Sequence, residues 1–540
     1  MITSRIRDAG DSALLLELEP VIAPAVNARI HGIAAALAGQ QMAGVRDVVP
    51  TFRSVAVHFD PLTADVGAIR EALASVAGQP VEDVAGDAVE VPVVYGGAEG
   101  PDLEAVAAFA GVSAAEVIER HSGAEYRVFM VGFLPGFAYM ASVDSTIAMP
   151  RRPSPRLSVP AGSVGIAGTQ TGVYPFASPG GWQLIGRTGS AMFDPQRTPP
   201  SLLAPGDRVR FVPVPSGFFA EPSFSSVRSS ADAELKLGAA KARSVVTVLK
   251  PGLFTTVQDE GRWGYQRLGV PVSGAMDLRS HRLANALVGN EASAATLEVT
   301  LAGPELRPES DTLVAVAGAD LGAVLDGASV PADAPAPCRA GSVLRFEGRR
   351  MGGRAYVSFA GGIDVPPILG SRSTHVRTRM GGVEGRALRA GDVLPLGVPP
   401  RRAAGGSMRS KTVPGGARLR VMSGPQDAFF PSDALQVLVG TRFVVANDSD
   451  RMGFRLTSDR RIARLEREMI SDATFAGAVQ VPASGQPILL MADRQTTGGY
   501  PQIAVVITAD LPLAGQLVPG DWVEFELCSR AEALAALVAQ

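Results

Sequence analysis

The chain has 540 residues, and its 50 Lys and Arg against 53 Asp and Glu leave a formal net charge of only −3. Hydrophobic residues make up 46% of it, which suits packed cores and excludes an extended disordered protein. The length favours several domains over a single core. No long basic run accompanies the near-neutral charge, so we expect neither nucleic acid nor a membrane surface as a partner.

The cysteines and the apolar stretches indicate the cellular compartment of the protein. Its two cysteines, Cys338 and Cys528, cannot form a disulfide framework, and neither has a Cys or His at metal-ligand spacing. No apolar stretch approaches the roughly 20 residues of a membrane helix, and no signal-like segment opens the sequence. We therefore expect a cytoplasmic protein.

Helical periodicity is confined to short segments. The predicted helices cover residues 23–38, 63–77, 102–121 and 276–288, and Thr63 is the expected N-cap of the second. With 60 Gly and 41 Pro, most of the remainder consists of short runs rich in Val, Ile, Leu and Phe between turns. This pattern favours β-barrels or sandwiches.

Two internal echoes indicate related domains. The Pro-Gly-Asp turn at 205–207 runs into an alternating strand, recurs at 519–521, and has a looser copy at 390–392. A second echo pairs the stretch 159–175 with 481–501, each running from Val-Pro-Ala to a Tyr-Pro that follows Gln-Thr. Three related β-barrels, ending near residues 214, 396 and 528, explain both echoes.

Common catalytic signatures are absent from the sequence. The nearest approach to a P-loop, at 406–412, has Ser410 where Gly is needed before the Lys. The five histidines are scattered without a metal-binding pair, and no Gly-x-Ser-x-Gly elbow occurs. We expect no metal site and no hydrolase of the Ser-His-Asp type.

Several Gly-rich polar phrases stand out because such segments do not contribute to the packing of a hydrophobic core. They lie at residues 132–139, 178–188, 255–277, 448–453 and 493–500. Such loops let the backbone approach a ligand closely and leave N–H groups free for an oxyanion or an amide. As a set they favour a binding surface for a small polar substrate with a carbonyl and a carboxylate.

Each polar residue in these phrases also has a structural explanation. Asp259 and Arg262 could pair across a turn, and Asp277 could cap the helix that follows it. Asp493 and Arg494 could form an ion pair at a barrel rim. The sequence alone leaves both explanations open for any single residue.

In chain order the phrases resemble those of a known family. Residues 1–215 resemble the B component of bacterial 5-oxoprolinase, an allophanate-hydrolase-subunit-1-like family, through GFLPGFAYM at 132–140 and SPGGWQLIGRT at 178–188. Residues 245–530 resemble the C component, its biotin-dependent-carboxyltransferase-like partner. There the matching phrases are TVQDEGRWGYQRLGVPVSGAMD, GGIDVPPILGSRST, SGPQDAFF, SDRMGFRL and MADRQTTGGYP.

The resemblance implies a mainly β protein with α+β elements, in which three cyclophilin-like β-barrel domains follow a small α+β domain. We expect six segments along the chain. They are the small α+β domain 1–88, the barrel of the B-like half 89–215, a linker 216–244, the first barrel of the C-like half 245–397, a linker 398–416 and the second barrel 417–540.

The resemblance also implies a hydrolase acting on a cyclic amide, which cleaves 5-oxo-L-proline to L-glutamate at the expense of ATP. The family's complex uses a separate A-type subunit that is not in this chain. Coupling to ATP makes chemical sense because phosphorylating the stable lactam activates its carbon for attack by water. Which component of the complex binds ATP, and whether copies of this chain assemble, are left open.

Two alternatives come from the same resemblance. The barrel pair also occurs as the carboxyltransferase region of urea carboxylase and urea amidolyase, although this chain lacks the Met-Lys-Met type of biotin-attachment site and any ATP-grasp domain. No covalent biotin is therefore expected on it. The other alternative is kinase regulation, because relatives of the halves are described as a kinase inhibitor and its antagonist. A fusion of the two would be self-cancelling.

We expect loops of the B-like barrel and of the C-like half to meet in a shared cleft. The carboxylates would act as base or cation partner, and Arg and Gln as anchors for a carbonyl or a carboxylate. His121 could equally be a satisfied histidine at a helix end. The predicted catalytic residues are Asp259, Arg262, Asp277, Asp493 and Arg494. The predicted substrate-binding residues are His121, Gln170, Tyr174, Trp182, Arg187, Gln258, Ser273 and Gln495.

Overall fold

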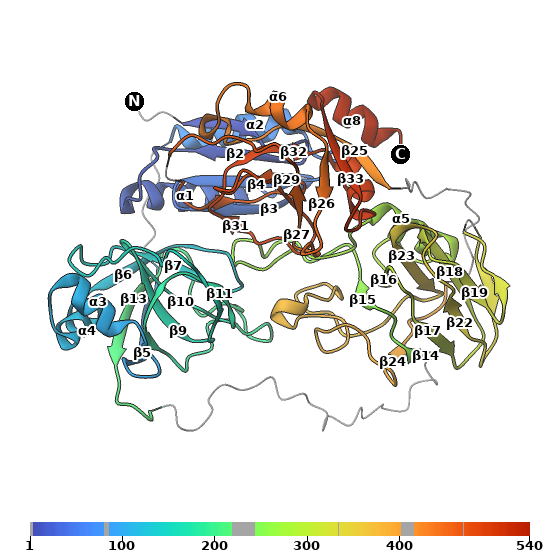
Figure 1. Cartoon of the computed structure of the whole chain (residues 1–540), viewed down its shortest axis with the longest axis horizontal. Coiled ribbons are helices and arrows are strands. Elements are labelled where there is room, and N and C mark those ends of the chain that lie inside the picture. The colour runs from blue at the N-terminus through green and yellow to red at the C-terminus, as the bar shows by residue number, and fades with distance from the viewer. Residues whose placement is uncertain (1–3, 80–85, 219–243, 333, 401–414, 468) are drawn as a thin grey trace.

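The protein is described by a computed structural model that covers residues 4–79, 86–218, 244–332, 334–400, 415–467 and 469–540. Strands dominate it and form one four-stranded sheet, two closed barrels, two larger open sheets and two short ribbons. Figure 1 shows the N-terminal sheet lying against the C-terminal barrel, with the other barrel and the open sheets on either side below them. None of the helices described here is long and apolar enough to cross a membrane.

The N-terminal unit is an antiparallel sheet with two helices on one face. Its strand order is β1-β2-β4-β3. Leu14 and Leu16 pack with the helices, whereas Leu15 packs on the opposite face with Phe475 and Val505 of the C-terminal barrel. Neighbouring strand residues point to opposite faces, so this sheet is buried on both sides. The elements are β1 (Arg5–Asp8), β2 (Ala13–Glu17), α1 (Pro24–Gly39), β3 (Val45–Pro50), β4 (Ser54–Phe59) and α2 (Val66–Ala77).

The second unit is a closed seven-stranded barrel in the order β10-β7-β6-β13-β5-β12-β9. The barrel closes through the parallel pairing of β13 with β5. Its elements are β5 (Ala88–Tyr95), α3 (Leu103–Ala110), α4 (Ala114–Ser122), β6 (Glu125–Val131), β7 (Ala138–Ala141), β9 (Ser163–Ala167), β10 (Gln170–Val173), β12 (Gln183–Arg187) and β13 (Arg208–Pro213). A ribbon of β8 (Arg156–Val159) and β11 (Ser178–Gly180) extends from it.

The C-terminal unit repeats this construction. It is a closed barrel in the order β25-β32-β29-β30-β27-β26-β33, and its parallel pair is β25 with β33. The strands are β25 (Gly416–Ser423), β26 (Phe443–Val445), β27 (Gly453–Thr457), β29 (Ala478–Gln480), β30 (Ile488–Leu490), β32 (Gln502–Val506) and β33 (Trp522–Leu527). Associated elements are α6 (Ala434–Val439), α7 (Leu511–Gly515), α8 (Arg530–Val538) and the ribbon of β28 (Asp472–Ala473) and β31 (Thr497–Gly498).

The middle unit is not a barrel, so the prediction of three barrels is wrong. It consists of two open sheets with α5 (Leu278–Leu287). The six-stranded sheet holds β14 (Val245–Lys250), β17 (Glu305–Pro308), β19 (Ala323–Leu325), β20 (Ala328–Ser329), β22 (Leu344–Phe346) and β24 (Val393–Pro395). The five-stranded sheet holds β15 (Phe254–Gln258), β16 (Thr296–Thr300), β18 (Thr312–Asp320), β21 (Ala336–Cys338) and β23 (Met351–Phe359).

The Gly-Asp turn explains both the success and the failure of the barrel prediction. Asp207, Asp392 and Asp521 each accept a hydrogen bond from the backbone N–H three residues earlier, so the three copies form the same turn. The turns before β13 and β33 lead into six-residue strands that pair on both sides. The turn at Asp392 leads into β24, which has three residues and pairs only with β14 at a sheet edge. The same turn therefore closes a barrel only where a long strand follows it.

Two helix predictions also need correction. The segment 102–121 is not one helix, because Gly111 adopts a φ of +68° and separates α3 from α4. Helix α2 begins after Asp65 rather than Thr63, since the Asp65 carboxylate accepts the N–H of Ala68 at 3.0 Å. Most of the two predicted linkers, residues 219–243 and 401–414, lies outside the described residues.

The first and last parts of the chain are held together by buried polar contacts. Asp11 accepts hydrogen bonds from the N–H of Thr508 at 3.0 Å and from its hydroxyl at 2.8 Å. Arg530 donates to the carbonyls of Gly10 and Asp11. The N-terminal sheet is thereby fixed to the C-terminal barrel.

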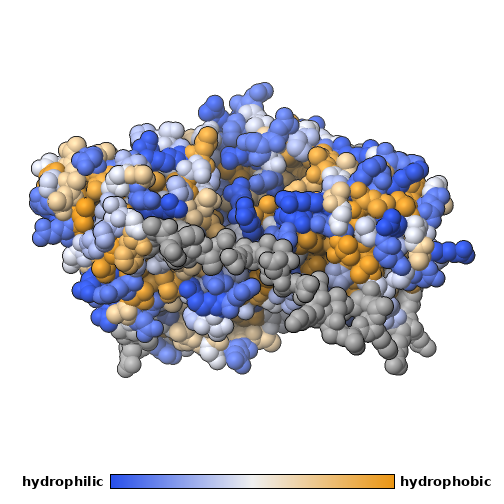
Figure 2. All heavy atoms as spheres, turned by 90° about the horizontal axis from the view of Figure 1, so that it is seen from below, coloured by the Kyte–Doolittle hydropathy of each residue, from blue (hydrophilic) through white to orange (hydrophobic). Residues whose placement is uncertain are grey.

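On the molecular surface, Figure 2 shows hydrophilic and hydrophobic residues interspersed over the face seen from below.

Replacing Asp11 by Ala should destabilise the protein by about 1–3 kcal/mol, because the partly buried N–H and hydroxyl of Thr508 lose their charged acceptor. Guanidinium chloride unfolding would measure the change. Glu71→Ala, at an exposed position of α2, is the matched control and should stay within about 0.5 kcal/mol of wild type. Equal stability of the two variants would contradict the proposed role of this contact.

Candidate functional site

The turn after β15 is held by Asp259. One carboxylate oxygen of Asp259 accepts the N–H of Gly261 at 2.8 Å and the hydroxyls of Ser371 and Ser373, and the other accepts the N–H of Arg372 at 2.6 Å. Gly261 has a φ of +89°, and a Cβ there would lie 2.7 Å from Val272, so only glycine fits. Asp259 therefore ties its own turn to the segment 371–373.

Arg262 lies in the same turn and is almost completely buried, with 1% of its surface exposed. Its Nη2 donates to the carbonyl of Ser373, and the described residues offer no hydrogen-bond partner to Nε or Nη1. Burial lowers the pKa of Arg262, although the charges of Asp259 and Asp493 oppose that shift. Asp259 and Arg262 do not form the ion pair across the turn that the sequence allowed, since each is bonded to the segment near Ser373.

Asp493 is held by a buried guanidinium rather than by its neighbour Arg494. Arg451 donates to both oxygens of Asp493 at 2.9 and 3.0 Å, and the hydroxyl of Ser273 donates to one of them at 2.8 Å. Burial by itself would raise the pKa of Asp493, but Arg451 keeps that pKa below its ordinary value. An ionised carboxylate with these donors is a poor general base.

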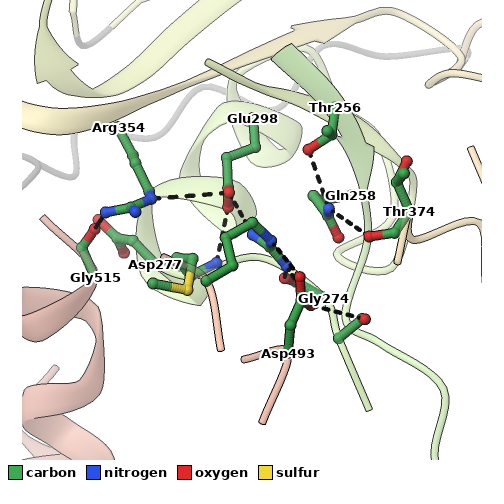
Figure 3. A network of polar contacts seen from close by, with 12 residues as sticks. Thr256, Gln258, Gly274, Asp277, Glu298, Arg354, Thr374, Asp493 and Gly515 are labelled. Atoms are coloured by element: carbon green, nitrogen blue, oxygen red, sulfur yellow. Dashed lines mark hydrogen bonds and ion pairs between the residues drawn. The ribbon is translucent and has the colours of Figure 1, made fainter. Parts of the chain in front are cut away.

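The same guanidinium reaches two further segments, at Gly274 and Glu298, which are both labelled in Figure 3. Arg451 donates to the carbonyl of Gly274 at 2.6 Å and to the carboxylate of Glu298 in β16. Glu298 also accepts the hydroxyl of Tyr356 at 2.7 Å and the N–H of Met276 at 2.8 Å. The network thus connects the middle sheets, the turn before α5 and the C-terminal barrel.

Asp277 has the structural role that the sequence left open. It caps α5 by accepting the N–H and the hydroxyl of Ser280 at 2.9 and 2.6 Å. Gln516 of the C-terminal barrel donates to it at 2.7 Å. Burial raises the pKa of Asp277. Its hydrogen-bonding capacity is largely used by the fold.

Arg494 points away from Asp493, toward the N-terminal sheet. It is 3% exposed, its Nη2 donates to the side chain of Gln266 at 3.1 Å, and its Nε has no partner within the described chain. Gln266 in turn donates through its backbone N–H to Asp47 at 3.1 Å. Burial lowers the pKa of Arg494 to about 10. Gln495, the next residue, lies close to Gly498 and accepts a hydrogen bond from Thr474 through its carbonyl.

Of the predicted residues of the B-like half, Tyr174 and Trp182 lie in one aromatic cluster. Tyr174 and Trp182 pack edge-on against Phe137 at 5.2 and 5.4 Å between ring centroids. Arg187 pairs with Glu99 at 3.2 Å on the barrel.

Two further predicted residues have barrel contacts of their own. His121 is a satisfied core histidine, because Tyr95 and Thr171 occupy its two ring nitrogens and burial lowers its pKa to about 3. Gln170 begins β10, paired with Ala141 and Ala167.

The two halves do touch through their glycine-rich loops. The N–H of Gly136 donates to the carbonyl of Leu268 at 3.0 Å, and Val131 forms a parallel bridge with Leu268. A Cβ on Gly132 would lie 2.1 Å from the Thr497 hydroxyl, and one on Gly269 would lie 2.2 Å from a carbonyl. Glycine is required by this close approach. A cleft shared between the halves remains a prediction.

Several residues of the site were missed by the sequence analysis. Ser371 and Ser373 hold Asp259, the carbonyl of Thr374 accepts from Gln258 at 3.1 Å, and Arg451 holds Asp493. His375 follows them, with Nδ1 2.6 Å from the Thr378 hydroxyl, and burial lowers its pKa to about 4. The hydroxyl residues Ser371, Ser373 and Thr374, close together just before His375, were the sequence feature that could have indicated these contacts.

No group of three or more His, Cys, Asp or Glu side chains that could hold a metal ion occurs among the described residues. Both cysteines are free, with Cys338 buried at the end of β21 and Cys528 directly after β33.

Comparison with known proteins first identifies the class. The protein-family model for the carboxyltransferase domain, subdomains C and D, matches residues 4–203. The family model for subdomains A and B of the same domain matches residues 268–527. The fold described above is therefore that of a carboxyltransferase-domain protein.

Similarity to curated proteins then identifies the family. The chain is 39% identical to the C component of 5-oxoprolinase from Escherichia coli K12 over 54% of its own length and 94% of that protein. It is 46% identical to the B component from Escherichia coli O157:H7, in a match that covers 38% of this chain and 95% of that protein. It is 43% identical to the B component from Bacillus subtilis, in a match that covers 39% of this chain and 92% of that protein. The chain belongs to the family of the B and C components of 5-oxoprolinase, with the B-like region first. The resemblance noted from the sequence is confirmed.

Two solved structures resemble this chain in fold. The crystal structure of TTHA0988 has a TM-score of 0.84 and 36% identity, and the match covers 97% of this chain and all of that one. The urea amidolyase of K. lactis has a TM-score of 0.51 and 28% identity over 71% of this chain, which is 25% of the amidolyase. The urea amidolyases are thus the more distant relatives.

His58, beside Arg494, should make stability depend on pH. Its ring is buried 5.4 Å from that of Phe475, and burial, with the charge of Arg494, lowers its pKa from 6.5 to about 3. Because the unfolded chain takes up this proton first, stability falls as the pH drops below about 6.5. In a plot of the free energy of unfolding against pH, His58→Leu should lower the slope between pH 6 and pH 4 by about 1.4 kcal/mol per pH unit.

Guanidinium chloride unfolding at several pH values would measure both slopes. Other buried histidines contribute equally to both proteins, so the difference isolates His58. Parallel profiles for wild type and variant would contradict the assignment.

Proposed function

We propose that the chain is the B and C component of an ATP-dependent 5-oxoprolinase, which hydrolyses 5-oxo-L-proline to L-glutamate together with a separate A-type subunit. The observation that carries the proposal is that the B and C components are each matched over more than nine-tenths of their length by one chain. Joining them fixes their ratio and raises their effective concentration.

The chemistry suits the groups at the site. Transfer of the γ-phosphoryl group of ATP to the lactam oxygen releases ADP and makes the ring carbon a better electrophile. Water attacks that carbon, the ring C–N bond breaks with the nitrogen taking a proton, and a second water releases phosphate from the acyl phosphate. Negative charge develops on oxygen during these steps, and a buried guanidinium such as that of Arg494 stabilises it.

We also propose a revised division of labour among the predicted catalytic residues. Asp259, Asp277 and Asp493 position the loops, because each accepts several hydrogen bonds from the fold. The two arginines retain buried nitrogen atoms without a partner among the described residues. The arginines therefore contact substrate or its activated form, while the carboxylates hold the loops that carry them.

The predicted segment boundaries, near residues 88, 215, 245, 397 and 417, are kept as part of the proposal. The third folded segment is built from open sheets, and the two closed barrels are proposed to be cyclophilin-like.

Carboxyl transfer is the second candidate function. It is favoured by the descriptions of both matching domain models, which name a carboxyltransferase. The urea amidolyase of Saccharomyces cerevisiae is 33% identical, but the match spans only 16% of that protein. The remaining length of that relative has no counterpart in the match, so we rank this function below the first.

Glutamate should be released from 5-oxo-L-proline and ATP only when this chain is mixed with an A-type subunit from the same organism. Each protein by itself should give only background, because the reaction is divided between them. Glutamate would be measured by an enzymatic or chromatographic assay. A well-folded pair that releases none would contradict the proposal, and urea-dependent decarboxylation of carboxybiotin would then be tested.

Replacing Arg494 by Ala should lower glutamate release by about 10²–10³-fold, because a buried cation at the site is lost. Circular dichroism and the unfolding midpoint would show that the variant folds. Arg460→Ala, on an exposed loop of the same barrel, is the matched control and should turn over normally. Normal turnover in folded Arg494→Ala would remove Arg494 from the site.

A further inference from the structure

The side-chain amide of Gln258 has a fixed orientation. Gln258 is completely buried at the end of β15, and its nitrogen donates to the carbonyl of Thr374 and to the hydroxyl of Thr256, both at 3.1 Å (Figure 3). A carbonyl can only accept, so the nitrogen must face Thr374 and the amide oxygen must face away from it. That oxygen, Oε1, has no donor among the described residues.

Arg262 has the complementary property. Its Nη2 is occupied by the carbonyl of Ser373, while Nε and Nη1 are buried donors without an acceptor in the described part of the chain. The nearby carboxylates are occupied, since Asp259 accepts four other donors and Asp493 is bonded to Arg451 and Ser273. The positive charge of Arg262 therefore has no direct carboxylate contact among the residues described.

The two side chains are held by one segment. Gln258 bonds to the carbonyl of Thr374 and Arg262 to that of Ser373, the preceding residue. Asp259, between them in sequence, fixes this segment through Ser371 and Ser373. A buried acceptor and a buried cation without partners each destabilise a fold substantially. Both are held by carbonyls of consecutive residues in one segment, and this shared support points to a ligand that supplies both missing partners.

We propose that Gln258 and Arg262 together bind a small molecule that carries an N–H group next to a carboxylate. The amide oxygen of Gln258 accepts the N–H, and the free nitrogens of Arg262 donate to the carboxylate. This inference rests on the proposed function. In 5-oxo-L-proline the ring N–H and the carboxylate-bearing carbon are adjacent, so one orientation of the molecule serves both side chains.

This orientation has a consequence for the reaction. The lactam carbonyl lies on the other side of the ring nitrogen from the carboxylate-bearing carbon. Holding the N–H and the carboxylate therefore leaves the carbonyl oxygen available to accept the phosphoryl group. Gln258 and Arg262 act in this account as substrate anchors, and neither exchanges a proton.

Glycine also permits close approach at this place. A Cβ on Gly381 would lie 2.9 Å from Nη2 of Arg262 and 2.0 Å from the Ser373 carbonyl. Gly381 has a φ of +68°, which a larger residue adopts only with strain. The backbone at Gly381 thus packs closely against the Arg262 guanidinium, where any side chain would clash.

The test compares three ligands on the full chain, alone and with the A-type subunit, by isothermal calorimetry without ATP. The probes are 5-oxo-L-proline, its N-methyl derivative and 2-pyrrolidinone, which lacks the carboxylate. We expect the N-methyl derivative to bind about 10-fold more weakly, and 2-pyrrolidinone about 100-fold more weakly. Equal affinities for the three compounds, or no binding of 5-oxo-L-proline to either preparation, would overturn the inference.

Variants assign the two contacts separately. Gln258→Met should reduce the preference for 5-oxo-L-proline over its N-methyl derivative to about twofold or less, and Arg262→Met should remove the preference over 2-pyrrolidinone. Gln502→Met is the matched control, because the amide oxygen of Gln502 is also buried without a partner among the described residues, but in β32. It should leave both preferences at their wild-type ratio.

The comparison of ligands on wild-type protein stands even where a variant fails to fold. Unchanged preferences in folded Gln258→Met and Arg262→Met would show that the pair has a purely structural role and would overturn the inference. The glutamate-release assay is independent of these measurements. A chain that releases glutamate with its partner but shows no ligand preference refutes this inference alone.

Discussion

The buried guanidinium of Arg451 is the interaction on which the arrangement of the site depends. It binds Asp493 on its own barrel, Glu298 in β16 of the middle sheets and the carbonyl of Gly274 before α5. Burying a charge is unfavourable unless every donor finds an acceptor. Burial by itself would lower the pKa of Arg451, but the carboxylates of Asp493 and Glu298 raise that pKa above its ordinary value. The positions of three segments are therefore fixed by the requirements of one side chain.

This constraint determines which groups remain available for chemistry. Asp493 is occupied by Arg451 and Ser273, and Asp277 by its helix and by Gln516. The carboxylates that attract attention in the sequence are thus used to assemble the site. Among the buried groups with unused hydrogen-bonding capacity in the described residues are the guanidinium of Arg262 and the amide of Gln258. The substrate anchors proposed here therefore suit the binding of an anionic amide better than the removal of a proton.

Much of the fold could be predicted, and the errors have physical causes. The Gly-Asp turns at 207, 392 and 521 are the same local structure, but whether a barrel closes depends on the length and pairing of the strand that follows. The Asp277 cap was one of two explanations open from the sequence, and the structure decides for it. His121 and Arg187 are each bonded within the first barrel, and their contact with substrate stays a prediction.

The sequence by itself determined the family, the order of the two regions and the glycine turns, because these are properties of consecutive residues. The tertiary structure decided which polar side chains are satisfied. Arg262 finds its acceptor 111 residues away at Ser373, Asp277 receives a donor 239 residues away from Gln516, and Arg451 reaches Glu298 across 153 residues. Whether a buried polar group has a partner depends on such distant contacts, which no local pattern records.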